Sequence, residues 1–419
     1  MSNPALLLPP RPQGRPESLA EYRQRGGYDG LAQATPDSLL AEVEKSGLRG
    51  RGGAAFPTIQ KWRLAAGVDE AEKYVVANGG EHEPGSRKDC HLVENHPHAV
   101  LEGLALAGLA TGASKGYVYL IEDMHGPKAS AERALAEANE AGLLPFPIEI
   151  HCGPTTYVAG EETAALNAIE GKEAKPRKKP PYPGQEGLFG KPTTVNNVET
   201  LAHVAWIARQ GSAAFAAIGT EHSKGTLLFT LGEEVERPGV YEMPFGTTYR
   251  ELIEQCGGGL RDGHKLRAIL PAMSASFLAA EHIDAPICYE GLKQHQTSPG
   301  CGGVRLVTEA TDVVALTIEI AEFFMNEQCG QCAPCRMETN QFVHILKAVQ
   351  AGKGPGYDDK MTKLAAFTRR KGFCSLIEMA AAPVLSAVRV FAEDFAKAAG
   401  PGSSGPGSSG PGSASGEDK

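Results

Sequence analysis

Four cysteines in the C-terminal third of the chain have a spacing that suits a metal centre. Cys329, Cys332 and Cys335 follow one another at C-x-x-C intervals, and Cys374 comes much later in the sequence. Three thiolates at this spacing can bind three irons of one cubane iron–sulfur cluster, and a distant fourth can complete the site. The first chemistry that the sequence suggests is therefore electron transfer.

Zinc and disulfide bonds are the alternatives for these cysteines. Structural zinc sites usually pair two separated C-x-x-C or Cys/His halves, so a run of three cysteines fits a cluster better. Nothing at the N-terminus suggests export, which makes disulfides the weaker alternative. The five remaining cysteines, which are scattered and are expected to be buried thiols, are Cys90, Cys152, Cys256, Cys288 and Cys301.

A glycine-rich segment over residues 47–62 could hold a phosphate or a flat ring. Glycines let the backbone approach a ligand closely, and their exposed amides form a nest for anions. The segment matches neither G-x-G-x-x-G after a strand nor the P-loop, so the two usual nucleotide signatures do not apply. The cations and rings that it would contribute are Arg49, Arg51, Lys61, Phe56 and Trp62.

Three further segments carry polar side chains suited to a ligand. Residues 78–85, Asn-Gly-Gly-Glu-His-Glu-Pro-Gly, follow a predicted strand, where open α/β sheets bind ligands. Glu161 and Glu162 begin a predicted helix, and complementing the helix dipole is their alternative role. Asn196 and Asn197 could hydrogen-bond a flavin or ribose edge, or could simply cap a helix.

These segments lie within a pattern of alternating strands and helices. Strands that alternate with helices at this spacing indicate an α/β domain with a mainly parallel sheet. The predicted strands are 74–77, 116–121 and 147–151, and the predicted helices are 36–46, 97–113 and 130–141.

Composition shifts divide the chain into five parts. A proline-rich N-terminal arm over residues 1–40 precedes the α/β domain, which is predicted over 41–224. Short strands around a turn predict a small α+β module over 225–310. Apolar residues at helical period predict a helical domain over 311–399. Residues 400–419 repeat Gly-Pro-Gly-Ser-Ser and are expected to form a disordered tail or linker.

Charge and hydropathy restrict the classes of partner. The net charge is −9 and no basic stripe is evident, which argues against nucleic-acid binding. The N-terminus lacks the basic region of a secretory signal, and the longest apolar stretch, 103–113, is about half of what a bilayer span needs. We therefore expect a cytoplasmic protein with no direct membrane insertion.

Taken together and in this order, the motifs resemble those of the NADH-binding flavoprotein subunit of respiratory complex I. The same family includes the diaphorase subunits of NAD-linked hydrogenases and formate dehydrogenases. The resemblance runs from about residue 17 to 399. It is carried by Gly-Leu-Arg-Gly-Arg-Gly-Gly-Ala, Gly-Glu-Glu-Thr-Ala, Gly-Lys-Pro-Thr-Thr-Val-Asn-Asn-Val-Glu-Thr and Cys-Gly-x-Cys-x-Pro-Cys-Arg with its late cysteine.

The resemblance implies a fold and a set of cofactors. It implies a Rossmann-like domain for FMN and NADH, a ubiquitin-like β-grasp (SLBB-like) module and a helical bundle that carries one [4Fe–4S] cluster. By analogy Glu83 and Glu162 would orient the nicotinamide ribose and amide. The residues implied for FMN are Gly50, Gly52, Lys61, Asn78, Glu81, Gly160, Glu161, Glu162, Asn196 and Asn197; those implied for NADH are Phe56, Glu83, Glu162, Lys179 and Tyr182; those implied for the cluster are Cys329, Cys332, Cys335 and Cys374.

The family pattern also implies partners, and this chain departs from it in places. A thioredoxin-like [2Fe–2S] subunit and a larger iron–sulfur subunit are the expected partners, through which the chain could lie at the inner membrane.

Gly80 replaces an aspartate of the family pattern, and Thr155 replaces a glycine. These changes favour a specialised paralogue. They leave open a diaphorase of a soluble reductase and a non-catalytic assembly module with a degraded pocket.

Overall fold

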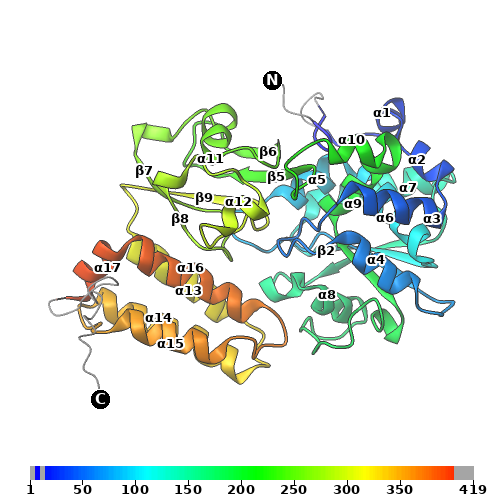
Figure 1. Cartoon of the computed structure of the whole chain (residues 1–419). Coiled ribbons are helices and arrows are strands. Elements are labelled where there is room, and N and C mark those ends of the chain that lie inside the picture. Colours follow the sequence, from blue (N-terminus) through cyan, green and yellow to red (C-terminus); the bar gives the residue numbers. More distant parts are fainter. Residues whose placement is uncertain (1–4, 10–14, 401–419) are drawn as a thin grey trace, which may run out of the picture. The chain divides into compact units, whose positions relative to one another are not determined.

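The computed structural model describes residues 5–9 and 15–400. The chain divides into two compact units, one over residues 1–306 and the other over 307–419. Figure 1 shows the course of the chain and the element labels. The prediction of a disordered tail or linker at 400–419 falls, apart from its first residue, outside the described residues.

The first unit contains a parallel four-stranded sheet, which confirms the predicted α/β class. Its strand order is β3-β2-β1-β4, and each neighbouring pair runs parallel. The strands are β1 (Tyr74–Asn78), β2 (Lys115–Ile121), β3 (Ile148–Gly153) and β4 (Thr193–Asn197). The sequence does not predict β4 as a strand, because Thr-Thr-Val-Asn-Asn has one apolar residue and its burial depends on its pairing with β1 and on its contact with α4.

Helices cover both faces of this sheet because its side chains alternate in direction. Val75 and Val118 pack into the core on one face, and Val76 and Tyr117 into the core on the other. The helices are α1 (Leu19–Gln24), α2 (Asp29–Gln33), α3 (Pro36–Ser46), α4 (Thr58–Ala66), α5 (Lys88–Asn95), α6 (Pro97–Thr111), α7 (His125–Glu140), α8 (Glu162–Ile169), α9 (Val198–Gln210) and α10 (Ser212–Ala216), with short turns η1 (Tyr157–Gly160) and η2 (Leu188–Gly190). Figure 1 shows α6, α7 and α9 above the sheet and α8 below it.

The helix ends follow the sequence signals with one exception. Thr35 caps α3, and Gly47 ends it in the left-handed conformation, as predicted. However, α7 begins at His125, before the predicted start at Ser130. Pro127 lies in the first turn of α7, where its missing N–H does no harm, so the proline does not delay the helix.

A second sheet of five strands follows, in the order β6-β5-β9-β7-β8. β5 pairs antiparallel with β6 and parallel with β9. A hairpin, a helical segment and a mixed sheet fit the β-grasp module that the resemblance implies. The elements are β5 (Thr226–Leu231), β6 (Gly239–Pro244), α11 (Tyr249–Glu251), η3 (Leu252–Cys256), η4 (Arg261–Gly263), β7 (Leu266–Leu270), β8 (Leu278–Ala279), η5 (Ala280–His282), α12 (Tyr289–Lys293) and β9 (Gly303–Thr308).

Residues 6–8 of the N-terminal arm are tied to β6. The Glu242 carboxylate accepts the backbone N–H groups of Leu6 at 3.1 Å, Leu7 at 2.9 Å and Leu8 at 2.9 Å. It also accepts the Thr226 hydroxyl at 2.7 Å. Burial raises the pKa of Glu242 to about 7, although these donors act in the opposite direction. Residues 6–8 are therefore held against β6 of the same chain.

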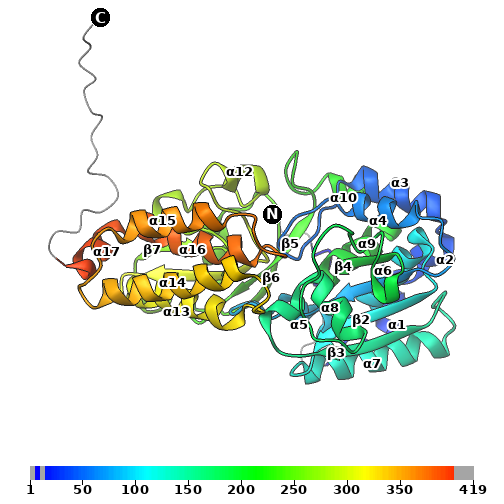
Figure 2. The ribbon, with the colours of Figure 1, turned by 90° about the horizontal axis from the view of Figure 1, so that it is seen from below.

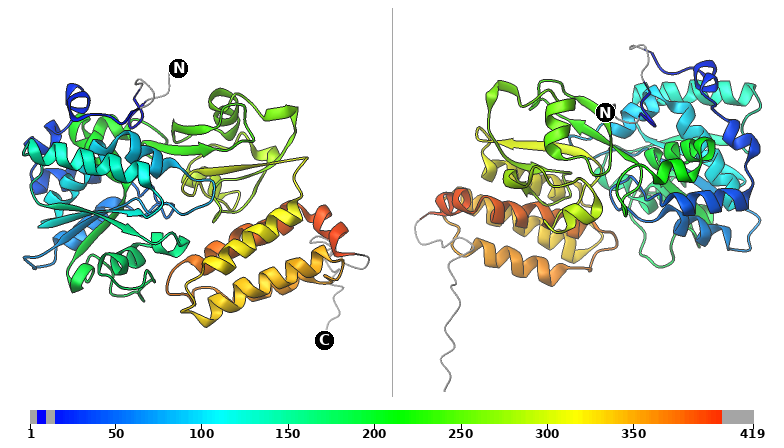
Figure 3. Two further views of the ribbon diagram at one scale, coloured as in Figure 1. Left: turned by 180° about the vertical axis from the view of Figure 1, so that it is seen from behind. Right: turned by 45° about the horizontal axis from the view of Figure 1, so that its top comes forward.

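The second unit is helical, as predicted. Its helices are α13 (Val313–Glu327), α14 (Ala333–Gln350), α15 (Tyr357–Thr368), α16 (Leu376–Val390) and α17 (Ala392–Ala399). Figures 2 and 3 show the four longer helices, α13 to α16, running alongside one another. The Asp312 side chain caps α13 by accepting two backbone N–H groups. Over the part of the chain that the structure describes, no helix has the length and apolar character that a membrane crossing requires.

Candidate functional site

The carboxyl ends of β1 and β4 bring three predicted site residues together. In the parallel register Ala77 is paired with Asn196, and Asn78 with Asn197. The Asn78 amide donates to the Gly160 carbonyl at 2.9 Å, and the Asn197 amide donates to the Asn78 carbonyl at 3.4 Å. Because open α/β sheets bind ligands at this edge, the three amides lie where the sequence predicts a site.

The two adjacent amides of β4 have different partners. Asn196 is buried and accepts a hydrogen bond from the Trp62 indole N–H at 2.9 Å. Asn197 accepts the Glu199 N–H at 3.0 Å, which caps α9, and donates to the Asp89 carboxylate at 2.6 Å. The capping alternative therefore applies to Asn197. The suggestion that Trp62 offers a stacking face is wrong, because its ring is completely buried.

A buried arginine holds the glycine-rich loop in place. Arg51 is 1% exposed, and its guanidinium donates to the carbonyl oxygens of Thr226 at 3.0 Å, Arg49 at 2.8 Å and Lys224 at 2.6 Å. The sequence suggested Arg51 as a cation for a ligand. The structure corrects this, since all of these contacts are made to the protein's own backbone.

Two aromatic rings of the predicted site are exposed, Phe56 in this loop and Tyr182 between α8 and η2. The Gly50 N–H donates to the Phe56 carbonyl at 2.9 Å and closes the loop. Gly52 lies against the end of β4, where an added Cβ would be 3.3 Å from the Asn197 Cβ. The side chains of Phe56 and Tyr182 are 46% and 51% exposed, so both rings can stack on a flat ligand.

Two lysines and two glutamates form a chain of ion pairs at the start of α8. Glu162 is 2.6 Å from the Lys61 ammonium and 2.7 Å from that of Lys179. Lys179 also contacts Glu161 at 2.8 Å. Burial alone would raise the pKa of Glu162, but the two ammonium groups lower it to about 2. Glu162 is therefore ionised at any physiological pH.

The neighbouring pair of acids after β1 is directed at other parts of the protein. Glu81 accepts the Cys90 N–H at 3.0 Å. Glu83 accepts the Met273 N–H at 2.8 Å and the Cys301 thiol at 3.2 Å. Burial raises the pKa of Glu83, although these donors lower it. Glu83 thus joins residues 78–85 to the loops of the second sheet.

Beside these acids, the backbone at Gly160 lies very close to the backbone at Gly80. A Cβ on Gly160 would be 2.7 Å from the Gly80 carbonyl oxygen and 3.3 Å from the His82 ring. The Nε2 atom of His82 is buried and has no hydrogen-bond partner within the described residues. A glycine with no room for Cβ and an unpartnered polar atom are what a closely held cofactor would require.

We expect Gly160→Ala to lose FMN and some stability, because its methyl group would overlap the Gly80 carbonyl. Overpacking of this kind costs about 1–3 kcal/mol. Flavin absorbance per chain and the thermal midpoint would measure both effects. Gly239→Ala is the matched control, since a Cβ there meets its nearest atom at an ordinary 3.6 Å. Equal flavin content in the two variants would contradict the tight approach.

The second unit brings the four predicted cluster ligands towards one end of α14. Cys332 is the N-cap residue of α14, and Cys335 lies in the first turn of this helix. The Phe373 N–H donates to the Cys332 sulfur at 3.2 Å, which places the segment containing Cys374 beside it. Burial and the neighbouring thiols, Cys374 first among them, raise the pKa of Cys335 to about 12.

The arrangement of these thiols suits a cluster with several irons. All nine cysteines are free of disulfide bonds. Among the described residues, no three His, Cys, Asp or Glu side chains converge as they would on a single metal ion. Cys374, Cys332 and Cys329 all act electrostatically on Cys335, so the four thiols lie near one another. In a cubane each of four thiolates binds a different iron, so the residues present fit a [4Fe–4S] cluster.

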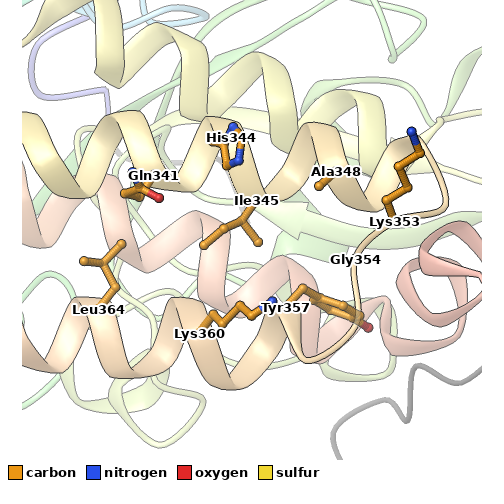
Figure 4. Close-up of a pocket in the computed structure, with 9 residues that line it drawn as sticks. All are labelled: Gln341, His344, Ile345, Ala348, Lys353, Gly354, Tyr357, Lys360 and Leu364. Carbon is orange, nitrogen blue, oxygen red and sulfur yellow. The ribbon is translucent and has the colours of Figure 1, made fainter.

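A separate cavity of about 440 Å³ lies between α14 and α15 (Figure 4). It contains none of the residues that the sequence predicts for a site. The Lys360 ammonium, which is part of the lining, donates to the Pro355 carbonyl at 3.0 Å. Its lining consists of Gln341, His344, Ile345, Ala348, Lys353, Gly354, Tyr357, Lys360 and Leu364.

Sequence reasoning missed a buried ion network near the same strand ends. Lys88 is 1% exposed and lies 2.6 Å from Asp89 and 2.9 Å from Glu199. Burial alone would lower the pKa of Lys88, but the carboxylates raise it. Lys88 and Asp89 are adjacent at the start of α5, but Glu199 lies on α9, so no local pattern reveals the network. His82 was also missed, although it belongs to the predicted segment 78–85.

Three protein-family models match this chain. The Nuo51 FMN-binding domain matches residues 43–206, and the iron–sulfur binding region of NADH-ubiquinone oxidoreductase-F matches 315–398. The SLBB domain matches residues 230–271. The first match contains the glycine-rich loop, the strand-end amides and the ion pairs. The second contains the four cysteines.

Individual proteins are similar over nearly the whole chain. An NADH-quinone oxidoreductase subunit of Streptomyces coelicolor is 38% identical over 413 residues, covering 94% of this chain and 92% of that protein. The HndC subunit of the NADP-reducing hydrogenase of Solidesulfovibrio fructosivorans is 37% identical over 394 residues, covering 91% and 80%. The solved structure of an NAD+-reducing [NiFe]-hydrogenase in the air-oxidised state has a TM-score of 0.83 at 32% identity, covering 92% of this chain and 67% of that one. With two cofactor regions matched and similarity along its length, the chain belongs to the family that these NADH-quinone oxidoreductase and hydrogenase subunits represent.

Proposed function

We propose that this chain is an NADH-oxidising electron-input subunit. Hydride passes from NADH to FMN, and single electrons continue to a [4Fe–4S] cluster and then to partner iron–sulfur subunits. The observation that carries the proposal is the presence, in one chain, of an FMN-binding region at 43–206 and an iron–sulfur region at 315–398. The cofactors supply the redox chemistry, while the protein binds, orients and tunes them.

On the FMN side, the protein's contribution is a set of backbone and amide donors at one sheet edge. Lys61 adds positive charge, which favours an anionic ligand. Gly160 supplies the close backbone approach. The residues proposed to hold FMN are Gly50, Gly52, Lys61, Asn78, Glu81, Gly160, Glu161, Glu162, Asn196 and Asn197.

On the NADH side, we assign binding to the exposed rings and the ion pairs. Phe56 and Tyr182 would stack on the nucleotide, and their exposure supports this. Glu162 and Lys179 would hydrogen-bond its polar groups. For Glu83 we propose a positioning role, because its carboxylate already accepts donors from Met273 and Cys301.

The cluster ligands would be Cys329, Cys332, Cys335 and Cys374. The proposed domains are residues 41–224 for FMN and NADH, 225–310 for the β-grasp module and 311–399 for the cluster. The proposed boundary after residue 40 falls within α3, so the N-terminal arm is continuous with the first domain.

The expected partners are a thioredoxin-like [2Fe–2S] subunit and a larger iron–sulfur subunit, in a complex that lies in the cytoplasm or at the inner membrane.

A second candidate function is that of the diaphorase subunit of a soluble reductase. The similarity to the hydrogenase subunit HndC and to an NAD+-reducing [NiFe]-hydrogenase favours it. Identifying the subunits that co-purify with the chain distinguishes the two.

Two measurements on the purified, anaerobically prepared protein test the proposal: an absorbance spectrum, and an analysis of iron and sulfide. We expect flavin bands that NADH bleaches, about four irons per chain and matching sulfide. A colourless preparation would support the non-catalytic assembly module instead. A site filled with zinc would overturn the assignment of the cluster.

A further inference from the structure

His82 borders the proposed flavin site. It lies in the 78–85 segment that follows β1, and its Cδ2 atom is 3.3 Å from the position of a Cβ on Gly160. The Asn78 amide donates to the carbonyl of the same glycine at 2.9 Å. The imidazole therefore occupies the same edge of the sheet as the strand-end amides.

One nitrogen of this imidazole lacks a partner. Nε2 is buried and accepts or donates no hydrogen bond within the described part of the chain. The two flanking acids differ, because Glu81 and Glu83 both accept donors from their own chain. Buried polar atoms are almost always paired, so an unpaired one calls for a missing partner. His82 therefore has a buried side-chain atom to which its own chain supplies no partner.

The imidazole is neutral near pH 7. Burial lowers the pKa of His82 to about 4, and a hydrogen bond with the Thr155 backbone offsets this in part. A neutral imidazole nitrogen donates or accepts one hydrogen bond, according to its tautomer. Gly80 adds no side chain, and a Cβ there would already be 3.0 Å from the Tyr119 ring. The group presented at this position is therefore polar and uncharged.

We propose that His82 is a cofactor-contacting residue, whose Nε2 hydrogen-bonds the bound flavin and gives this wall of the site a polar group without negative charge. The inference rests on the proposed function, since it requires FMN to bind at the Gly160 edge. Reduced FMN carries a negative charge on its ring system near neutral pH. A carboxylate at this position would repel that charge across a partly buried site, whereas imidazole does not.

Three substitutions separate the hydrogen bond from the charge. His82→Asn keeps a neutral hydrogen-bonding group, His82→Leu removes hydrogen bonding, and His82→Asp adds a carboxylate. His222→Asp is the matched control, since it makes the same change at an exposed residue. For each protein, quenching of FMN fluorescence on titrating the apoprotein gives the affinity for oxidised flavin. Anaerobic spectroelectrochemistry gives the two-electron potential of bound flavin.

The expected results differ among the variants. His82→Leu should weaken oxidised FMN binding about tenfold, the effect of losing one hydrogen bond to a buried group. His82→Asn should stay within about threefold of the wild type. His82→Asp should weaken the binding of reduced FMN about tenfold more than that of oxidised FMN. This difference lowers the two-electron potential of the bound flavin by about 30 mV. His222→Asp should change neither quantity.

Equal FMN affinity and potential in all four variants and the wild type would overturn the inference while leaving the proposed function intact. That result would mean that a water molecule, and not the flavin, hydrogen-bonds the Nε2 atom of His82. A potential in His82→Asp that shifts no more than in His222→Asp would also overturn it. Failure of the wild type to bind FMN would overturn both. Thermal midpoints of the variants guard against misfolding, and His82→Asn, which keeps a similar polar shape, provides the test if His82→Leu does not fold.

Discussion

Replacing Cys332 by serine is expected to abolish the cluster while NADH still reduces the flavin. Cys332 is the N-cap residue of α14, and its sulfur accepts the Phe373 N–H at 3.2 Å, which joins the two segments that carry the ligands. Iron content should fall from about four per chain to nearly none, and electron transfer to a cluster-dependent acceptor should fall about a hundredfold or more. Iron analysis, electron paramagnetic resonance and stopped-flow absorbance measure these effects.

Flavin reduction should survive because the FMN-binding residues and the cysteines belong to different compact units, divided after residue 306. Cys256→Ser is the matched control. It changes a partly buried thiol at the end of η3, which packs against the core of the second sheet, and both cofactors should remain. Full activity of Cys332→Ser toward the cluster-dependent acceptor would rule out this path for the electrons.

Strands with apolar runs were predictable, and those defined by pairing were not. Tyr74–Asn78 is nearly all apolar and buried on both faces, which is typical of parallel sheets. β4 has one valine, and its burial depends on β1 and on α4, which lies far away in the sequence. The start of α7 was misplaced for another reason, because a proline in a first turn looks the same in sequence as a helix break.

The segments that form the candidate site were predictable, but the roles of single residues within them were not. Composition cannot show whether Arg51 meets a ligand or three carbonyl oxygens, since its role depends on where residues 224–226 return. The same holds for Glu83, whose partners lie near residues 273 and 301. Each of these roles is a long-range contact. The cysteine run is different, because its local spacing favours a cluster without any knowledge of long-range contacts.

The adjacent acids Glu161 and Glu162 show how position on a helix divides roles. Glu161 is the N-cap residue of α8, and its carboxylate accepts the N–H groups of Thr163 at 2.8 Å and Ala164 at 3.1 Å. This contact confirms the dipole-complementing alternative for Glu161. Glu162 begins the helix itself, and its side chain points to Lys61 and Lys179 instead.

Glu162→Gln is expected to keep FMN but to raise the KM for NADH about tenfold, the usual cost of losing a charge-assisted hydrogen bond. The amide cannot balance the two ammonium groups that lie 2.6 and 2.7 Å from the carboxylate, so Lys61 and Lys179 lose their fixed positions. Steady-state kinetics with NADH and flavin absorbance per chain measure the two outcomes. Glu173→Gln is the control, because it removes the same charge from an exposed ion pair with Lys175.

The pH dependence follows from the same contacts. The pKa of about 2 for Glu162 lies below its ordinary value of 4.5, so its ion pairs stabilise the folded protein above pH 4.5 and are lost as the pH falls toward 2. Between about pH 5 and 9 the KM for NADH should therefore show no step from this carboxylate. A step in that range that disappears in Glu162→Gln would mean that the lysines do not hold the carboxylate ionised. An unchanged KM in Glu162→Gln would remove Glu162 from the NADH site.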